Sequence, residues 1–264
     1  MSSTALPQGQ VKQWHVIVFV IVAGLLTLLV LYGALGNLLL LRGQSGFPSD
    51  IHRWHEGQSG TLGVILLGGS LLALLWRPQN KPLLAQFLVL SIAILCLAFA
   101  TLSGAGFNPI VLAVGGVLIG ILVAAYPRPH ALFQVRGEGS LSYPLLAITV
   151  IAAIFLAPIL ARELNYQILG MTQHDVHALN YHWLTSVGLA LLLILGGSLA
   201  ATRRPGWQAL ACITGIAFLY LGSVAILLPG YAGSWGTTGG ILGVLGGLGY
   251  LASSLVEARK NKLA

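Results

Sequence analysis

Charged residues are scarce in this sequence. Its 264 residues include only 13 Lys and Arg and 6 Asp and Glu, so charged side chains make up 7% of the chain. Soluble domains carry about 25% charged residues and need them to build a surface that faces water. With 56% hydrophobic residues and a mean hydropathy of +0.88, the chain is predicted to be a polytopic membrane protein.

Several site signatures are also missing. The two cysteines, Cys96 and Cys212, both fall inside apolar runs, which excludes a disulfide framework. The sequence contains no Walker, GxSxG, HExxH or CxxCH motif and no lysine in the middle of an apolar run. The net charge of +7 comes from basic residues scattered between apolar runs. Because they form no basic stripe, nucleic acid is excluded as a partner.

Long apolar runs dominate what is present. About 20 apolar residues cross a bilayer as a helix, and the first run exceeds the apolar core of a signal peptide, which indicates a retained helix. The sequence predicts an all-α membrane protein with eight transmembrane helices at about 16–40, 58–76, 83–102, 109–126, 143–161, 182–201, 207–228 and 237–255.

The basic residues alternate between the connecting segments. One side of the predicted membrane holds ten of them: Lys12, Arg77, Lys81, Arg128, Arg136, Arg203, Arg204, Arg259, Lys260 and Lys262. The other side holds only Arg42, Arg53 and Arg162. The positive-inside rule therefore predicts cytoplasmic termini in a bacterial or archaeal plasma membrane.

The two halves of the sequence resemble each other. The segment LLGGSLLALLWRP (66–78) matches ILGGSLAATRRP (194–205). Residues 1–136 and 137–264 are thus predicted to be parallel four-helix repeats, related by a pseudo-two-fold axis along the membrane normal. The fourth span of each half contains a GxxxG pair, Gly116/Gly120 and Gly239/Gly243. These pairs favour close helix contact, with room for a flat cofactor as the alternative.

Five histidines cluster in two polar stretches on the predicted outer side, FPSDIHRWHEGQSG (47–60) and MTQHDVHALNYHW (171–183). Residues three apart share one face of a helix, as do His52 with His55 and His174 with His177. Imidazole is a usual ligand of haem iron, copper and zinc. The predicted cofactor ligands are His52, His55, His177 and His182, and a directly bound metal could also use His174.

Two acids accompany these histidines. Asp50 and Asp175 are the candidate catalytic residues, since each could accept a proton from a ligating ring and fix its tautomer. Each could instead cap a helix N-terminus. The histidines, with Trp54 and Trp183 nearby, could likewise belong to an interfacial belt.

This arrangement resembles haem A synthase. The likeness lies in eight spans forming two halves, with DIHRWHEG opening the second span and NYHWLTSVGLALLLILGG the sixth. It implies an eight-helix fold, bound haem and histidine ligands His52 or His55 and His182. The family also places a histidine on helices four and eight, whereas 109–126 and 237–255 contain none, and its outer cysteine pair is absent.

The expected function is therefore that of a haem-binding membrane oxidoreductase or electron carrier in contact with the lipid bilayer and with a quinone or a redox protein. A copper or zinc site at the outer face is the second reading. A non-catalytic subunit of a larger membrane complex, a homo-oligomer or a small-solute transporter is the third.

Overall fold

The computed structural model describes residues 13–38, 49–134 and 141–263, with the side chains of 49–51 and 260–263 left out. None of the described residues lies in a strand. The helices are α1 (Gln13–Leu38), α2 (Ser49–Gly60), η2 (Thr61–Gly68), α3 (Gly69–Leu74), η3 (Pro78–Asn80), α4 (Pro82–Thr101), α5 (Pro109–Ala125), η4 (Pro129–Phe133), α6 (Tyr143–Gln173), α7 (Val176–Leu179), α8 (His182–Ala201), α9 (Trp207–Leu227) and α10 (Gly236–Leu263). The predicted all-α architecture is confirmed for these residues.

Seven helices of the described chain are long and apolar enough to cross a membrane. They coincide with seven of the eight predicted spans. The eighth prediction, 109–126, corresponds to α5, which is apolar but has only 17 residues. At 1.5 Å per residue α5 is about 25 Å long, slightly shorter than the hydrocarbon core of a typical bilayer.

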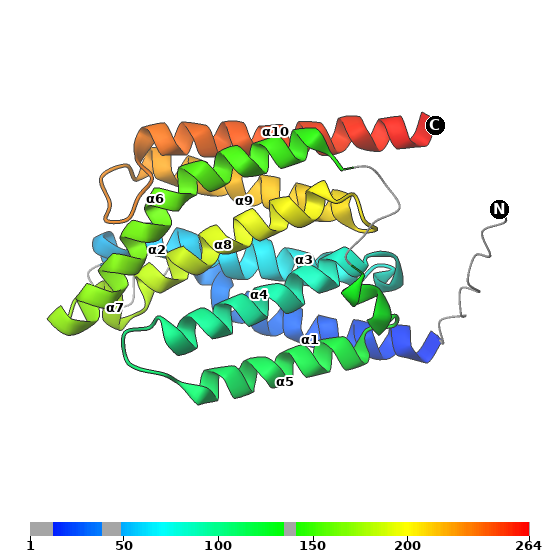
Figure 1. Cartoon of the computed structure of the whole chain (residues 1–264), viewed down its shortest axis with the longest axis horizontal. Coiled ribbons are helices and arrows are strands. Elements are labelled where there is room, and N and C mark those ends of the chain that lie inside the picture. The colour runs from blue at the N-terminus through cyan, green and yellow to red at the C-terminus, as the bar shows by residue number, and fades with distance from the viewer. Residues whose placement is uncertain (1–12, 39–48, 135–140, 264) are drawn as a thin grey trace.

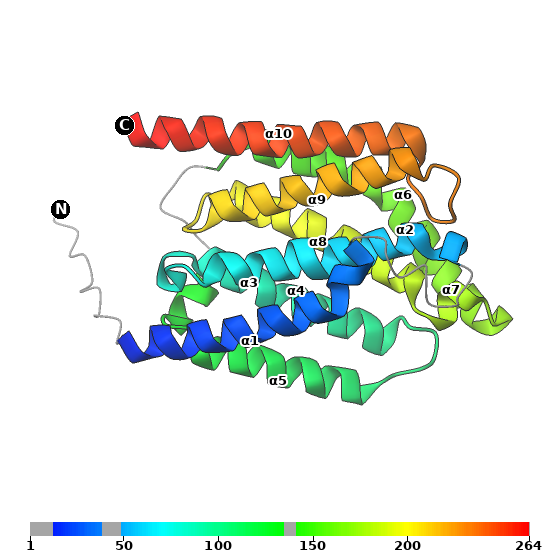
Figure 2. The ribbon, with the colours of Figure 1, turned by 180° about the vertical axis from the view of Figure 1, so that it is seen from behind.

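The long helices run up and down through one bundle, with α5 and α10 on opposite edges (Figures 1 and 2). Helix α8 lies at the centre of the bundle. Of its most apolar 18-residue stretch, 67% is buried, compared with 17% of the corresponding stretches of α1 and α6. Short connections turn the chain at each end. We call one end the histidine end, made of residues 49–55, 174–182 and 228–235. The opposite, basic end is made of residues 76–81 and 201–207 (Figure 1).

Helix α6 differs from the prediction. The sequence predicts that this span ends at residue 161 and that an outer loop follows to 181, but α6 continues to Gln173. The polar residues taken for a loop include Glu163 and Gln167, which are both fully buried. They face the interior of the bundle, so the helix persists where a solvent-exposed segment was expected.

The second span also begins earlier than predicted. Helix α2 starts at Ser49 and runs without a break into η2, an eight-residue π-helix, and then into α3. A π-helical turn is rare and is frequently found at functional sites. Here it lies directly after the helix that carries His52 and His55.

Glycines bring α9 and α10 into close contact. A Cβ atom on Gly240 would lie 2.7 Å from the Gly222 carbonyl oxygen, and one on Gly247 would lie 2.6 Å from the Gly215 carbonyl oxygen. The predicted close helix contact is confirmed at Gly243 of α10, where an added Cβ would lie 3.1 Å from the Gly222 Cα, whereas a Cβ on its partner Gly239 would meet the Phe155 ring at 2.9 Å. It is wrong for Gly116 and Gly120 on α5, where an added Cβ meets nothing within 4 Å.

Candidate functional site

Four imidazole rings meet at the histidine end. The ring centroid of His52 lies 4.9 Å from that of His177 and 4.8 Å from that of His182. The centroid of His55 lies 5.2 Å and 5.0 Å from the same two rings, which are themselves 6.0 Å apart. These are the four residues predicted as cofactor ligands, and we call them the histidine cluster.

Helix geometry explains the first pair. His52 and His55 lie three residues apart in α2, so their side chains project from the same face. That face packs against α8, and both rings are buried, with 9% and 1% of their surfaces exposed. The prediction that they share a face is confirmed.

A short helix between two left-handed residues places the second pair. His174 ends α6 with φ of 57°, and Tyr181 precedes α8 with the same φ. Left-handed backbone is costly for residues other than glycine and cannot continue a right-handed helix, so each of these residues interrupts the helical path. The two turns bring His177 of α7 and His182 of α8 to the same point.

His174 lies outside the cluster. Its spacing from His177 predicts a shared helical face, but the helix breaks at His174 itself, and the His174 side chain is exposed. The prediction of a common face is wrong, and His174 makes no ring contact with the four clustered histidines among the described residues.

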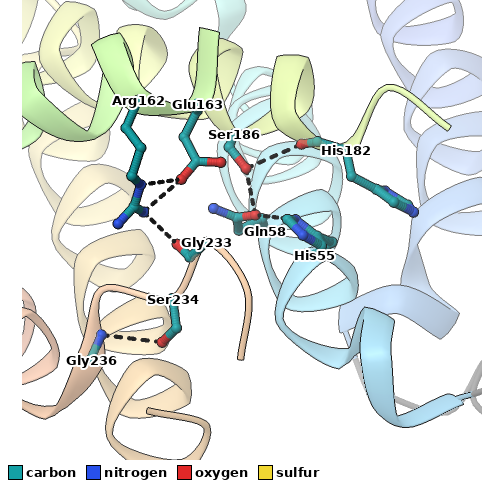
Figure 3. Close-up of polar contacts among 9 residues, drawn as sticks. All are labelled: His55, Gln58, Arg162, Glu163, His182, Ser186, Gly233, Ser234 and Gly236. Carbon is teal, nitrogen blue, oxygen red and sulfur yellow. Dashed lines mark hydrogen bonds and ion pairs between the residues drawn. The ribbon is translucent and has the colours of Figure 1, made fainter. Parts of the chain in front are cut away.

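A glutamine defines the tautomer of His55. The Nδ1 atom of His55 lies 3.0 Å from Oε1 of Gln58 (Figure 3). Gln58 is only 2% exposed, and its Oε1 also accepts a hydrogen bond from Oγ of Ser186 at 2.7 Å. Because an amide oxygen only accepts, Nδ1 of His55 carries the hydrogen and Nε2 carries the lone pair. Such a hydrogen bond behind the ring is typical of metal-ligating histidines.

Asp175 has two roles in the structure. As the N-cap of α7, its Oδ2 accepts hydrogen bonds from the Ala178 amide at 3.0 Å and from the Trp183 indole at 2.9 Å. Its Oδ1 lies 3.5 Å from Nδ1 of His177. Partial burial raises the pKa of Asp175, but these three contacts outweigh burial and hold the pKa below its ordinary value.

The other candidate acid, Asp50, lies in the first turn of α2, and its side chain is outside the described residues. The alternative of an interfacial belt does not account for the tryptophans. Trp54 is fully buried and Trp183 is 6% exposed, so both face the interior of the bundle rather than lipid.

Three ring nitrogens of the cluster have no hydrogen-bond partner. These buried atoms are Nδ1 of His52, Nε2 of His55 and Nε2 of His177. Buried polar atoms are nearly always paired, so a group of three points to a bound species that satisfies them. As the rings stand, no group of three or more His, Cys, Asp or Glu among the described residues is arranged to hold a metal ion. The planes of His55 and His182 are nearly parallel, at 8°.

A cavity of about 550 Å³ adjoins the cluster. Its lining residues include His177, Asp175, Trp183, Arg162 and Tyr166. This volume lies within the usual range of small-molecule sites. The Trp183 ring, which also lines the cavity, contacts both His55 and His177, at centroid distances of 4.9 and 5.1 Å.

An ion pair borders the same region. Arg162 Nη2 donates to Oε1 of Glu163 at 2.6 Å and to the Gly233 carbonyl at 3.3 Å (Figure 3). The other carboxylate oxygen of Glu163 is buried without a partner. A Cβ atom on Gly233 would lie 3.3 Å from the His55 ring and 3.4 Å from this oxygen. The loop between α9 and α10 therefore covers the cluster on this side.

Three residues of this site were not predicted from the sequence. Gln58 and Ser186 are uncharged and match no motif, and Glu163 was assigned to a loop. The one signal that could have pointed to Gln58 is its spacing of three from His55, which places both on one helical face.

Comparisons of this chain with protein-family models, with curated proteins and with solved structures each found no match.

Proposed function

We propose that this chain is an integral membrane metal-binding protein whose histidine cluster holds one transition-metal ion, copper or zinc. The observation that carries the proposal is the convergence of four imidazoles, three of them with a buried nitrogen that lacks a partner. Imidazole suits both ions, and copper binds such sites more tightly.

The spacing of the rings suits one ion. A ring nitrogen binds zinc at about 2.0–2.1 Å, so four rings arranged tetrahedrally around an ion have centroids roughly 5 Å apart. For five of the six pairs of rings in the cluster, the centroid distances run from 4.8 to 6.0 Å. Rotation of the rings, above all of the parallel pair His55 and His182, would then bring the nitrogens to a common point.

The protein would supply the geometry, and the ion would supply the chemistry. Four protein ligands leave no open position, which is typical of sites that do not bind substrate at the metal. With copper the site would carry one electron, in keeping with an electron carrier. With zinc the site would be structural and would tie α2, α7 and α8 together.

Metal analysis of the detergent-purified protein tests this proposal. We expect about one copper or zinc per chain, and loss of the metal from His55→Ala and His182→Ala variants. His174→Ala is the matched control, because it removes an exposed histidine of the same segment and should keep the metal. Equal metal content in all four proteins, or none in the wild type after reconstitution, would refute the proposal.

Haem is the second candidate, and it rests on the resemblance to haem A synthase and on the cavity beside His177. Two axial imidazoles on one haem iron have centroids ~6 Å apart across the porphyrin. His177 and His182 have this separation, but His52 and His55 lie close to both and occupy the place of the macrocycle. The pairs that join His52 or His55 to His177 or His182 are closer, at 4.8 to 5.2 Å, and this packing favours a directly bound ion over a bis-histidine haem.

A haem in the cavity would have His177 as its single ligand and Arg162 near its carboxylates. A Soret band that is lost in His177→Ala and retained in His52→Ala would favour this candidate over a directly bound ion.

For the membrane topology we propose eight spans, with α5 as the eighth, arranged as halves α1–α5 and α6–α10. A two-fold axis between the two halves would relate the second span, which contains η2 and α3, to α8, and would relate α4 to α9. The contact of α8 with α4 then has its counterpart in the contact of η2 and α3 with α9, which supports two halves. The distribution of basic residues favours the basic end on the cytoplasmic side. A cysteine at position 174 should then react with an impermeant maleimide on intact cells, and one at position 208 should not.

A further inference from the structure

A second cavity lies at the basic end, far from the histidines. Its volume is about 460 Å³, and it lies between the α3–α4 and α8–α9 connections. Its lining residues include Trp76, Arg77, Lys81, Arg203, Trp207 and Gln208. No aspartate or glutamate is among its lining residues.

The three cations differ in how far they are already neutralised. Arg203 donates through Nε to Glu257 at 3.1 Å. Lys81 Nζ donates to the carbonyl oxygens of Ala73 and Trp76, which are neutral. Arg77 contacts the ring of Trp76, with 5.4 Å between its Cζ and the ring centroid. Neither Lys81 nor Arg77 is paired with an acidic side chain among the described residues.

Two further observations indicate excess positive charge at this end. Burial and then the nearby charge of Arg77 lower the pKa of Lys81. Arg204, which is adjacent in sequence to two lining residues, is only 4% exposed, and its Nη2 has no hydrogen-bond partner in the described structure. A buried guanidinium without an acidic partner is costly unless an anion compensates it.

The position of the cavity indicates which kind of anion it would bind. It lies where two spans end and two begin, and its two tryptophans are of the type that anchors helices at the level of lipid head groups. Trp76 is 69% exposed at the rim. Basic pockets between transmembrane helices at this depth recognise phosphorylated head groups.

We infer that this cavity binds the phosphate head group of an anionic phospholipid, with Arg77 and Lys81 as its principal cations. The inference does not depend on the metal site. The two connections overlap the ends of the sequence segments 66–78 and 194–205 that resemble each other, so one lipid would bridge both proposed halves.

Native mass spectrometry of the detergent-purified protein, titrated with phosphatidylglycerol, tests the inference. Phosphatidylcholine with the same acyl chains is the lipid control, and glycerol phosphate is the soluble control. Arg77→Asn is the variant of choice, because Arg77 has a φ of 50° and asparagine tolerates this left-handed backbone. Arg128→Asn is the matched control, since it removes a cation that does not line the cavity.

We expect phosphatidylglycerol to bind more tightly than phosphatidylcholine. Its dissociation constant should rise about fivefold in Arg77→Asn, the factor that corresponds to ~1 kcal/mol per cation. It should rise further in Arg77→Glu and stay within twofold in Arg128→Asn. Equal binding of the two lipids, or equal loss in Arg77→Asn and Arg128→Asn, would overturn the inference. Binding of glycerol phosphate as tight as that of the lipid would also overturn it and assign the cavity to a soluble phosphate.

Discussion

Replacing Gln58 by leucine should weaken metal binding without removing a ligand. The substitution deletes the acceptor for Nδ1–H of His55 at 3.0 Å while keeping a side chain of similar volume. The neutral ring of His55 can then place its hydrogen on Nε2, the atom that must carry the lone pair toward the ion. Ser186 keeps a second contact, 3.1 Å from the His182 carbonyl oxygen, so the effect falls mainly on His55.

The size of the effect follows from the burial of this hydrogen bond. Gln58 is 2% exposed and His55 is 1% exposed, so water cannot replace the lost acceptor. A buried donor left without a partner costs about 1–3 kcal/mol. Loss of such a bond behind a ligating histidine typically lowers metal affinity 10- to 100-fold. We therefore expect the dissociation constant for copper or zinc to rise by about this factor.

Competition against a chromophoric chelator measures the dissociation constant, and thermal unfolding of the metal-free protein checks that the fold is intact. Gln58→Glu is the matched variant, because a carboxylate keeps the acceptor and should bind the ion at least as tightly as the wild type. If Gln58→Leu bound the ion with wild-type affinity while His55→Ala did not bind it, the tautomer argument would be refuted.

Three further predictions concern stability and pH. Gly222→Ala places a Cβ 2.6 Å from backbone atoms of α10 and should lower the free energy of unfolding in detergent by about 1–3 kcal/mol. Gly246→Ala is the control, because its Cβ meets nothing within 4 Å and should be neutral or stabilising. Equal effects of the two substitutions would contradict close packing of α9 on α10. Arg162→Leu leaves the fully buried Glu163 unpaired and should lower the free energy of unfolding by about 1–3 kcal/mol. Adding Glu163→Gln to this variant should restore the lost stability. If stability is not restored, the lost ion pair is not the cause. The stability that the Asp175 carboxylate contributes is present above its ordinary pKa of 3.8 and is lost as the pH falls through its lower pKa in the folded protein. Unfolding measured from pH 5 to 2 should therefore show a steeper loss of stability in the wild type than in Asp175→Asn.

Much of the fold could be predicted from apolar length alone. Lipid leaves few alternatives to a helix, since every backbone polar group must be satisfied internally. The failures occurred where polar residues face inward. Residues 49–57 and 162–173 read as outer loops because they are polar, yet they are helical, and Glu163 and Gln167 are fully buried.

The cluster was predictable in part. The spacing of three in α2 is enough to place His52 beside His55. No periodicity relates His177 to His182, because the left-handed backbone of Tyr181 lies between them. The contact of Gln58 with Ser186 joins residues 128 positions apart, and only the packing of α2 on α8 brings them together.

The two proposed halves supply the histidines of the cluster in different ways. The resemblance to haem A synthase implies one site inside each half, but each half contributes histidines to a single cluster between α2 and α8. His52 and His55 come from one helix, whereas the second half needs both α7 and α8 to supply His177 and His182. The four-residue helix α7 has no counterpart among the described elements of the first half. The added helix α7 lets the second half supply two of the four proposed ligands, as α2 does alone for the first half. Shortening the 174–181 segment should therefore abolish metal binding as completely as removing both His52 and His55, while the bundle itself, held by the other helices, should still fold.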